Sequence, residues 1–423
     1  MATSEAAPPL TGPIPVITGR GWTIAGRTLG LRDYRFLLAS MLFAFVATWI
    51  SRITQDWLLL EMTGSVAAVG LAVTFQFAPV LLFGLWGGVL SDRFPRLRIV
   101  RIAQGVTVAS LAMLAVLLMT EALEVWHVYA LAALAGLAGV VEGPARSALV
   151  TQVVPPPQLH GAIGMNATAF HVGSLVGATG SGVIIATWGA RWAIVAALVC
   201  ALLAAAALLL VRVRHLPSLP STAPTTGLRD GLAYARRKPA IRWSFVLIAF
   251  IATFGMTHSV LYAAAARADA FDSGAAGFGT YFAMSSLGAV VGAVLAISRR
   301  RIGLGPVLVT AIVFGATMTL AAAAVTEPLF LIAIVCLSAA RIFCVTGIEA
   351  LFQLSANPWM RGRVAGAYFV IVAAGQTVGP VLVGHVAQAL GLSAAFAVAG
   401  GIPLLTAAVI AVIVGRAGRH VTA

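Results

Sequence analysis

Charged residues are scarce in this chain of 423 residues: they make up 9% of it, whereas 60% is hydrophobic. Soluble domains carry roughly 25% charged residues, so this supply cannot cover a water-facing surface. The mean hydropathy of +0.99 agrees. A soluble enzyme and a disordered scaffold are therefore excluded, and lipid is the expected solvent for most of the chain.

Lysine and cysteine are also rare. The single lysine, Lys238, lies in ARRKPA, so the chain has no G-x-x-x-x-G-K-[ST] phosphate-binding loop and no sign of an ATP-driven pump. The three cysteines, Cys200, Cys336 and Cys344, all lie in apolar runs, and an odd, buried set argues against a disulfide framework.

An integral-membrane enzyme is the alternative from a different class. It would need clustered carboxylates or paired histidine ligands, but the sequence has no DDxxD, no HExxH and only seven scattered histidines. We therefore expect no enzyme activity, no metal and no cofactor, with a proton gradient as the energy source.

Long apolar runs recur along the chain, each sufficient for a membrane-spanning helix. They predict two sets of six spans, near 36–60, 66–90, 99–119, 128–150, 161–187 and 192–211, then 243–266, 278–298, 305–325, 329–351, 364–386 and 393–414. The predicted domains are an N-terminal tail (1–35), a six-helix bundle (36–211), a linker (212–242), a second six-helix bundle (243–415) and a C-terminal tail (416–423). This is an all-α integral membrane protein with two related halves.

The net charge of +14 comes from 27 Lys+Arg against 13 Asp+Glu. The basic residues form short clusters between apolar runs, not a face for nucleic acid, so no nucleic-acid partner is expected. They gather before the first span, at 93–101, 212–242, 299–301 and 361–363, and after the last span. The positive-inside rule then places both termini in the cytoplasm. The predicted location is the inner membrane of a bacterium, and the linker segment from Leu228 to Trp243 is basic enough to form an amphipathic helix on the inner leaflet.

The segment GGVLSDRFPRLRIV, from Gly87 to Val100, carries a recognisable pattern. It resembles the signature G-x-L-a-D-R-x-G-R-[RK] of the major facilitator superfamily, between the second and third spans. The matching residues are Gly88, Leu90, Asp92, Arg93 and Arg96, whereas Pro95 and Leu97 depart from the pattern. In this family the motif latches the two halves in the outward-facing state, which the resemblance implies for Gly88, Asp92, Arg93 and Arg96.

Other segments resemble the enterobactin-exporter and multidrug-efflux branch of the same family. They are QDWLLLEMTGS, EGPARSALV and MRGRVAGAYF. The family's antiporter motif, G-x-x-x-G-P-x-x-G-G, is degraded to GSLVGATGSG in the fifth span, which retains Gly177. The eleventh span keeps GQTVGPVLVG, including Gly379 and Pro380, and these three residues are expected in helix packing.

The two halves also repeat each other in sequence. At a separation of 202 residues, Gly164, Gly177, Gly182 and Gly189 coincide with Gly366, Gly379, Gly384 and Gly391. Duplicated halves around a central cavity are typical of secondary transporters.

Ionisable residues at membrane depth are functional candidates. Arg52 and Asp56 lie one helical turn apart in the first span, where they can pair on one face. Asp56 is either the proton-accepting group, controlled by Arg52, or half of a static ion pair near the outer mouth. Arg341 lies at the centre of the tenth span as a candidate for substrate-anion binding or coupling. Glu142 in the fourth span is a further coupling candidate, with a structural role as its alternative.

Uncharged polar residues and histidines near mid-depth are candidates for the cavity wall. They are Gln76, Asn166, His171, His258 and Gln376. Each histidine also has a plain alternative as a hydrogen-bonded packing residue.

These features together predict a twelve-helix secondary transporter. By resemblance, it exports a small amphiphilic molecule, drug-like or siderophore-like, against protons. An importer on the same fold is the alternative. The expected partners are the small-molecule substrate and the lipid bilayer, and we expect a monomer.

Overall fold

The computed structural model describes residues 28–155, 158–212, 228–268, 271, 273–297, 299, 302–324, 326–357 and 360–421. The helices of the N-terminal half are α2 (Arg32–Thr63), α3 (Val66–Arg93), α4 (Arg96–Met119), α5 (Val125–Val153), α6 (Leu159–Trp188) and α7 (Ala190–Leu209). Those of the C-terminal half are α9 (Pro239–Phe250), η2 (Ile251–Gly255), α10 (His258–Ala266), α11 (Gly274–Ile297), α12 (Leu304–Ala321), α13 (Glu327–Ser355), α14 (Arg361–Leu390) and α15 (Leu392–Val421). The short helix α8 (Leu228–Arg237) lies between the halves in sequence.

Twelve helical segments of the described chain are long and apolar enough to cross a membrane. They coincide with the twelve predicted spans, and no strand occurs in the described ranges. The first and seventh spans begin a few residues before their predicted starts, at Arg32 and Pro239. The all-α membrane fold is confirmed.

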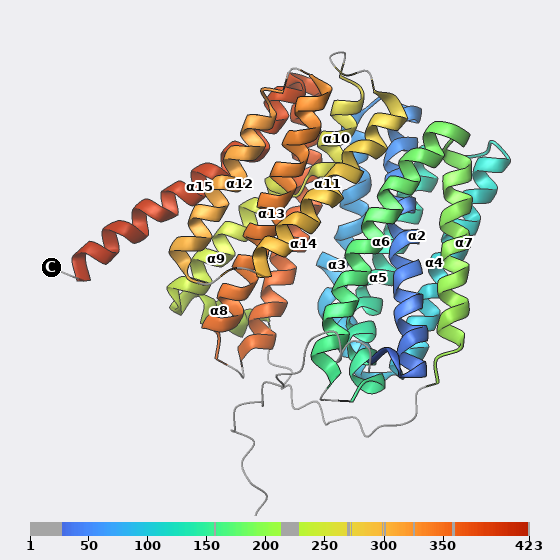
Figure 1. Ribbon diagram of the computed structural model, residues 1–423, viewed down its shortest axis with the longest axis horizontal. Helices are drawn as coiled ribbons and strands as arrows, with labels where there is room; N and C mark the ends of the chain where they lie inside the picture. Colours follow the sequence, from blue (N-terminus) through green and yellow to red (C-terminus); the bar gives the residue numbers. More distant parts are fainter. Residues whose placement is uncertain are drawn as a thin grey trace, which may run out of the picture.

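The two halves lie side by side, with the N-terminal half on the right of Figure 1 and the C-terminal half on the left. Helix α3 of one half packs against α14 of the other, and α6 packs against α11. We call the end of the bundle with Arg32, Arg96, Arg98, Arg361 and Arg363 the basic end. The end where α2 finishes at Thr63 is the opposite end.

The repeated glycines occupy equivalent places in the two halves. Gly177 of α6 packs against the backbone of α2, where an added Cβ would lie 2.8 Å from the Val46 carbonyl oxygen. Gly379 of α14 packs in the same way against Thr253 of η2. The matched pair Gly189 and Gly391 ends α6 and α14 with φ of 89° and 86°, a conformation that favours glycine. The sequence repeat therefore reflects a structural repeat.

Contacts between the halves gather toward the opposite end. Gly182 of α6 meets Gly279 of α11, where a Cβ on Gly182 would lie 2.4 Å from the Gly279 Cα. Gly70 of α3 lies against the Pro380 carbonyl of α14. Beyond it, the Ser65 hydroxyl donates to Gln388 Oε1 at 3.0 Å. The halves are thus closed at the opposite end.

The seventh span is not one regular helix, although its hydropathy predicts an unbroken run. It passes from α9 through the π-helical turn η2, leaves helical geometry at Met256 and Thr257, and resumes as α10 at His258. Such π-helical turns interrupt the backbone hydrogen-bond ladder and are frequent at functional sites. The break places polar backbone at mid-depth.

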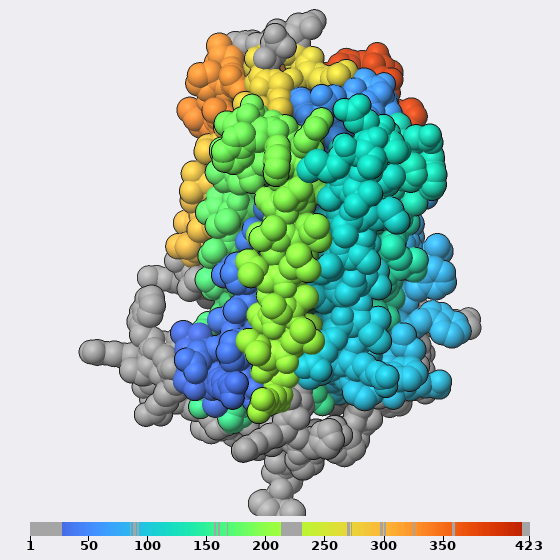
Figure 2. Space-filling model, turned by 90° about the vertical axis from the view of Figure 1, so that its right-hand side faces the viewer, coloured from blue at the N-terminus to red at the C-terminus, as the bar shows by residue number. Residues whose placement is uncertain are grey.

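The outer wall is apolar, as a lipid-facing surface requires. In Figure 2, α7 runs up this face of the N-terminal half between α6 and α4. Its exposed side chains include Val199, Leu202 and Leu203. On the basic side of the C-terminal half, α8 forms the predicted amphipathic helix, and the Lys238 ammonium that follows it donates to the Ser355 carbonyl at 3.0 Å.

Candidate functional site

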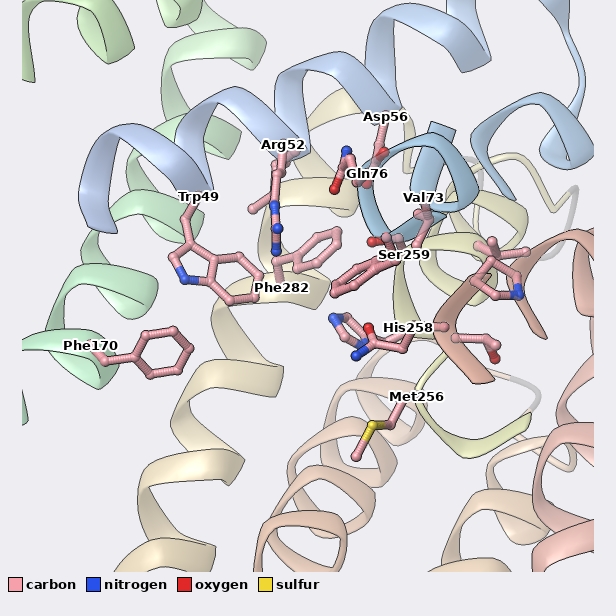
Figure 3. Close-up of a pocket in the computed structure, with 16 residues that line it drawn as sticks. Trp49, Arg52, Asp56, Val73, Gln76, Phe170, Met256, His258, Ser259 and Phe282 are labelled. Carbon is pink, nitrogen blue, oxygen red and sulfur yellow. The ribbon is translucent and has the colours of Figure 1, made fainter. Parts of the chain in front are cut away.

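A cavity of about 230 Å³ lies between the halves, and we call it the central cavity. Helix α2 supplies Trp49, Arg52 and Asp56, which lie on one face because residues three and four apart are neighbours on a helix. Helix α3 adds Gln76 and Phe77 from the same half. Figure 3 shows Trp49, Arg52, Asp56 and Gln76 along one side of this space.

The break in the seventh span forms the facing wall. Met256, Thr257, His258 and Ser259 line the cavity there. Helices α11 and α14 add Phe282 and Gln376. Because Thr257 makes no side-chain cap to α10, the N-terminal turn of that helix presents backbone N–H groups without a capping acceptor. The irregular backbone is tolerated at membrane depth because it lines a polar cavity.

Asp56 is the buried carboxylate of this site. Its side chain is 2% exposed, and its Oδ1 atom accepts no hydrogen bond from the described protein. The Ser259 hydroxyl and the Arg52 guanidinium are its polar neighbours. A buried charged carboxylate with an unmet oxygen is strongly disfavoured, so this position suits a group that takes up and releases a proton.

The expected ion pair between Arg52 and Asp56 is not formed. Within the described ranges, the only pair at ion-pair distance is Glu142 with Arg146. The Arg52 guanidinium instead lies 5.5 Å from the centroid of the Phe77 ring. In Figure 3 the Gln76 amide is drawn between the two charged groups. In this structure the two groups therefore do not form a static ion pair, because Arg52 packs against Phe77 of α3 and Asp56 is buried; the role of Asp56 as the proton-accepting group stays a prediction.

A larger cavity of about 890 Å³ extends from this site to the basic end, and we call it the vestibule. It shares Trp49, Arg52 and Phe170 with the central cavity. The Phe170 ring lies 6.4 Å from the Trp49 ring and 5.2 Å from that of Phe45, which gives the junction an aromatic wall. The halves are therefore separated toward the basic end and closed at the opposite end.

The vestibule also receives two of the predicted residues. Asn166 lines it and accepts a hydrogen bond from the Tyr34 hydroxyl at 3.2 Å. Glu142 lines it and accepts a hydrogen bond from Arg146, one turn away on α5. The structure thus groups Arg52, Asp56, Gln76, His258 and Gln376 in the central cavity and places Asn166 and Glu142 nearer the basic end.

Arg341 and His171 lie outside the linings of these cavities. Arg341 of α13 lies near His258 and Tyr262 but lines neither cavity. Beside Tyr262, the Ser285 and Ser338 hydroxyls lie 2.9 Å apart. His171 is half-buried beside Phe170, with ring centroids 5.4 Å apart.

The residues of the loop motif are only partly visible. Gly88 and Asp92 belong to α3, but the surroundings of Gly88 and the side chain of Asp92 lie outside the described part of the structure. Arg93 is exposed, and Arg96 donates to the Ala148 carbonyl at 3.4 Å. The packing residues are clear: Gly177 and Gly379 seat neighbouring helices, and Pro380 meets α3 at Gly70.

Some cavity residues were not predicted from the sequence. The sequence did not indicate Thr257 and Ser259 as cavity residues, because they lie in an apolar run that predicts a continuous helix. Trp49 is one turn before Arg52, and the i, i+3 spacing indicates the same face.

The sequence model of the transmembrane secretion effector family matches residues 29–417. The chain belongs to this family of the major facilitator superfamily. A bacterial homologue of the human lysosomal transporter Spinster, solved inward-facing and unoccupied, superposes with a TM-score of 0.68 at 15% identity, covering 90% of this chain and 95% of that one. The nucleoside transporter NupG superposes with a TM-score of 0.67 at 14% identity, covering 90% and 98%.

One curated relative is similar over a short stretch. The Staphyloferrin A transporter of Staphylococcus aureus is 25% identical over 68 residues, which are 16% of this chain and 17% of that protein. The family and the structural neighbours are transporters, not enzymes. The protein is therefore a multi-pass membrane transporter with the major facilitator fold.

Proposed function

We propose that this protein exports a small amphiphilic compound, drug-like or siderophore-like, in exchange for protons. Substrate binds between the two halves, which open alternately to each side of the membrane. The description of its family as secretion effectors supports export, and the stretch similar to a siderophore transporter supports the substrate class.

The distribution of charge supports an orientation in a bacterial cytoplasmic membrane. Basic residues concentrate at cytoplasmic membrane ends, so the basic end faces the cytoplasm in this proposal. The vestibule is then open to the cytoplasm and the opposite end is closed. This is the loading state of an exporter.

The observation that carries the proposal is Asp56, a carboxylate buried to 2% exposure with an unpaired oxygen at the junction of the two halves. A protonated Asp56 is neutral and suits this buried place. When substrate enters beside Arg52, the carboxylate loses its proton to the cytoplasmic side. Asp56 thereby holds a proton in the absence of substrate and releases it when substrate binds.

The cavity walls indicate which chemistry the substrate offers. Trp49, Phe77, Phe170 and Phe282 give apolar and aromatic surface. The polar groups include strong donors: the Arg52 guanidinium and the NH₂ groups of Gln76 and Gln376. We infer an aromatic or amphiphilic compound with oxygen acceptors, as in a catecholate.

The test uses everted membrane vesicles energised by respiration, with a pH-sensitive dye that is quenched in their acidic lumen. Ethidium, chloramphenicol or the tris-catecholate enterobactin is added to vesicles with wild type, Asp56→Asn or Arg341→Ala. The matched control is Glu61→Gln, which replaces an exposed carboxylate of the same helix. Proton-coupled export predicts dequenching by at least one compound in wild type and Glu61→Gln and its loss in Asp56→Asn.

Two results would contradict the proposal. Equal dequenching in wild type and Asp56→Asn would remove Asp56 from the coupling. Absence of dequenching, together with direct uptake of a compound into right-side-out vesicles, would make the protein an importer.

A further inference from the structure

A second polar cavity lies inside the N-terminal half, between α2, α3, α4 and α5. Its volume is about 170 Å³, and we call it the side chamber. Its polar lining comprises Thr48, Ser51, Arg52, Gln55, Gln76, Thr107, Ser110 and Glu142. Such a lining is unexpected in the interior of a membrane-embedded half, where unpaired polar groups are costly.

The side chamber has hydrogen-bond acceptors without donors. Gln55 is 6% exposed; its Nε2 donates to Ser51 Oγ at 2.7 Å, whereas its Oε1 has no partner in the described protein. Thr107 and Ser110 donate into their own helix at 3.1 and 2.8 Å, which leaves their oxygen lone pairs available. A buried acceptor without a donor is destabilising. Water is the donor that fits, and the volume holds roughly five molecules.

The side chamber adjoins both of the other cavities. It shares Arg52 and Gln76 with the central cavity, and it shares Thr48, Gly139 and Glu142 with the vestibule. Two routes therefore connect the surroundings of Asp56 with the basic end. The wide route passes Trp49 and Phe170, and the narrow one runs inside the N-terminal half.

We propose that the side chamber is filled with water and carries protons between the Asp56 region and Glu142 while substrate occupies the vestibule. The proposal rests on the proton-coupled export described above. An amphiphile bound against Trp49 and Phe170 displaces water from the wide route. A proton leaving Asp56 then needs another hydrogen-bonded path, and the side chamber is too small to admit the substrate.

The charges around the side chamber suit this role. Glu142 is the only carboxylate in its lining, and it is held by Arg146 on the same helix. From α2 the chamber faces Arg52, whereas α3 and α4 contribute only uncharged groups to the lining. The fixed positive charge of Arg52 disfavours an excess proton that rests in the chamber. Beside Arg52 an excess proton meets an electrostatic barrier, and the carboxylate of Glu142 is the group of the lining that attracts it toward the basic end.

A thiol measurement tests the presence of water without any substrate. Ala135 lines the side chamber and neither of the other two cavities. Ala135→Cys is made in a background with Cys200, Cys336 and Cys344 replaced by alanine, and the purified protein is treated with 2-aminoethyl methanethiosulfonate. Because position 135 is itself exposed, the comparison is Val199→Cys, at an exposed position of α7 that lines none of these cavities. We expect reaction at least about tenfold faster at position 135, because the reactive thiolate forms where water reaches it.

A filling variant tests the coupling. Ala135→Leu occupies the side chamber, and its control Ala130→Leu adds the same side chain at an exposed position of α5 outside the described cavities. With enterobactin as the probe, Ala135→Leu should slow proton-coupled dequenching by roughly a hundredfold, the lower end of the range for loss of a proton-transfer group. Exchange of labelled enterobactin at equal pH should persist in both variants.

The two measurements separate this inference from the proposed function. If wild type dequenches with none of the three compounds, proton-coupled export has failed, and the thiol comparison alone decides whether the chamber holds water. Equal thiol reactivity at positions 135 and 199 would overturn the inference. So would normal coupling in Ala135→Leu.

Discussion

Gly379 is the residue with the least room for a side chain among the matched glycines. An added Cβ would lie 1.6 Å from the Thr253 carbonyl oxygen, whereas nothing lies within 4 Å of such an atom at Gly366 of the same helix. Gly379→Ala should therefore lower the stability by about 1–3 kcal/mol, the usual effect of overpacking. Thermal unfolding in detergent measures it. Gly366→Ala is the control. Equal thermal unfolding midpoints for the two variants would contradict the prediction and would show that η2 shifts to make room for the added methyl group.

Arg52 is the subject of a second prediction, since its guanidinium contacts Phe77 and the residue lines all three cavities. Arg52→Lys keeps the charge but loses the planar group that donates to several acceptors at once. We expect weaker enterobactin binding, by roughly tenfold, with proton coupling retained. Binding is measured by tryptophan fluorescence titration, and Arg267→Lys near the opposite end is the control. An unchanged affinity would remove Arg52 from the substrate site.

Helix α8 packs on α14, and polar contacts tie its C-terminal end to the C-terminal half. Lys238 donates to the Ser355 carbonyl and to Asn357 Oδ1, and the Tyr234 hydroxyl accepts from the Asn357 N–H at 3.1 Å. Lys238→Met keeps the apolar stem and removes both donations. Trypsin should then cleave after Arg236 and Arg237 several-fold faster, because a helix that detaches also unfolds more often.

The control for α8 is Arg416→Met, which removes an exposed positive charge at the end of α15. Its digestion pattern at Arg236 and Arg237 should match that of wild type. If Lys238→Met is cleaved no faster, the apolar face of α8 and the Tyr234 contact hold the helix without Lys238.

The spans themselves were predictable because their apolar runs are long and the breaks between them are polar. The seventh span shows the limit: its residues are as apolar as those of a regular helix, and the π-helical turn depends on the packing of Gly375 and Gly379 against Ala252 and Thr253. A hydropathy profile carries no information about contacts between helices, so it does not predict this turn. The break, with Thr257 and Ser259, was therefore missed.

The candidate site was predicted only in part, because contacts between helices again decide where its side chains lie. Asp56, Gln76, His258 and Gln376 stood out as polar residues in apolar runs. The spacing of Arg52 and Asp56 gave the correct helix face, but the rotamers depend on Gln76 and Phe77 of another helix. The side chamber is formed by four helices together, so the sequence around Ser51 and Gln55 did not predict it.

The arrangement of the two halves predicts that movement at the opposite end is required for transport. Ser65 and Gln388 meet there across the halves, with a distance of 3.0 Å between their side-chain oxygens. Ser65→Cys with Gln388→Cys, joined by a short bifunctional thiol reagent, should hold the molecule closed at this end. Dequenching should fall by at least roughly tenfold, since the open state is no longer populated.

Each single cysteine variant treated with the same reagent is the control and should transport as before. Full transport by the cross-linked double variant would mean that this end does not open. That result would contradict alternating access for this protein.

The seam between α6 and α11 is made at Gly182 and Gly279, with backbone against backbone. Separating these two glycines frees no large side chain from a packed pocket and requires no rotamer change at either position. A membrane potential of 100 mV acts on one elementary charge with about 2.3 kcal/mol. In the proton-coupled export proposed above, the entry of one proton at such a potential supplies this amount of free energy for separating the two helix faces.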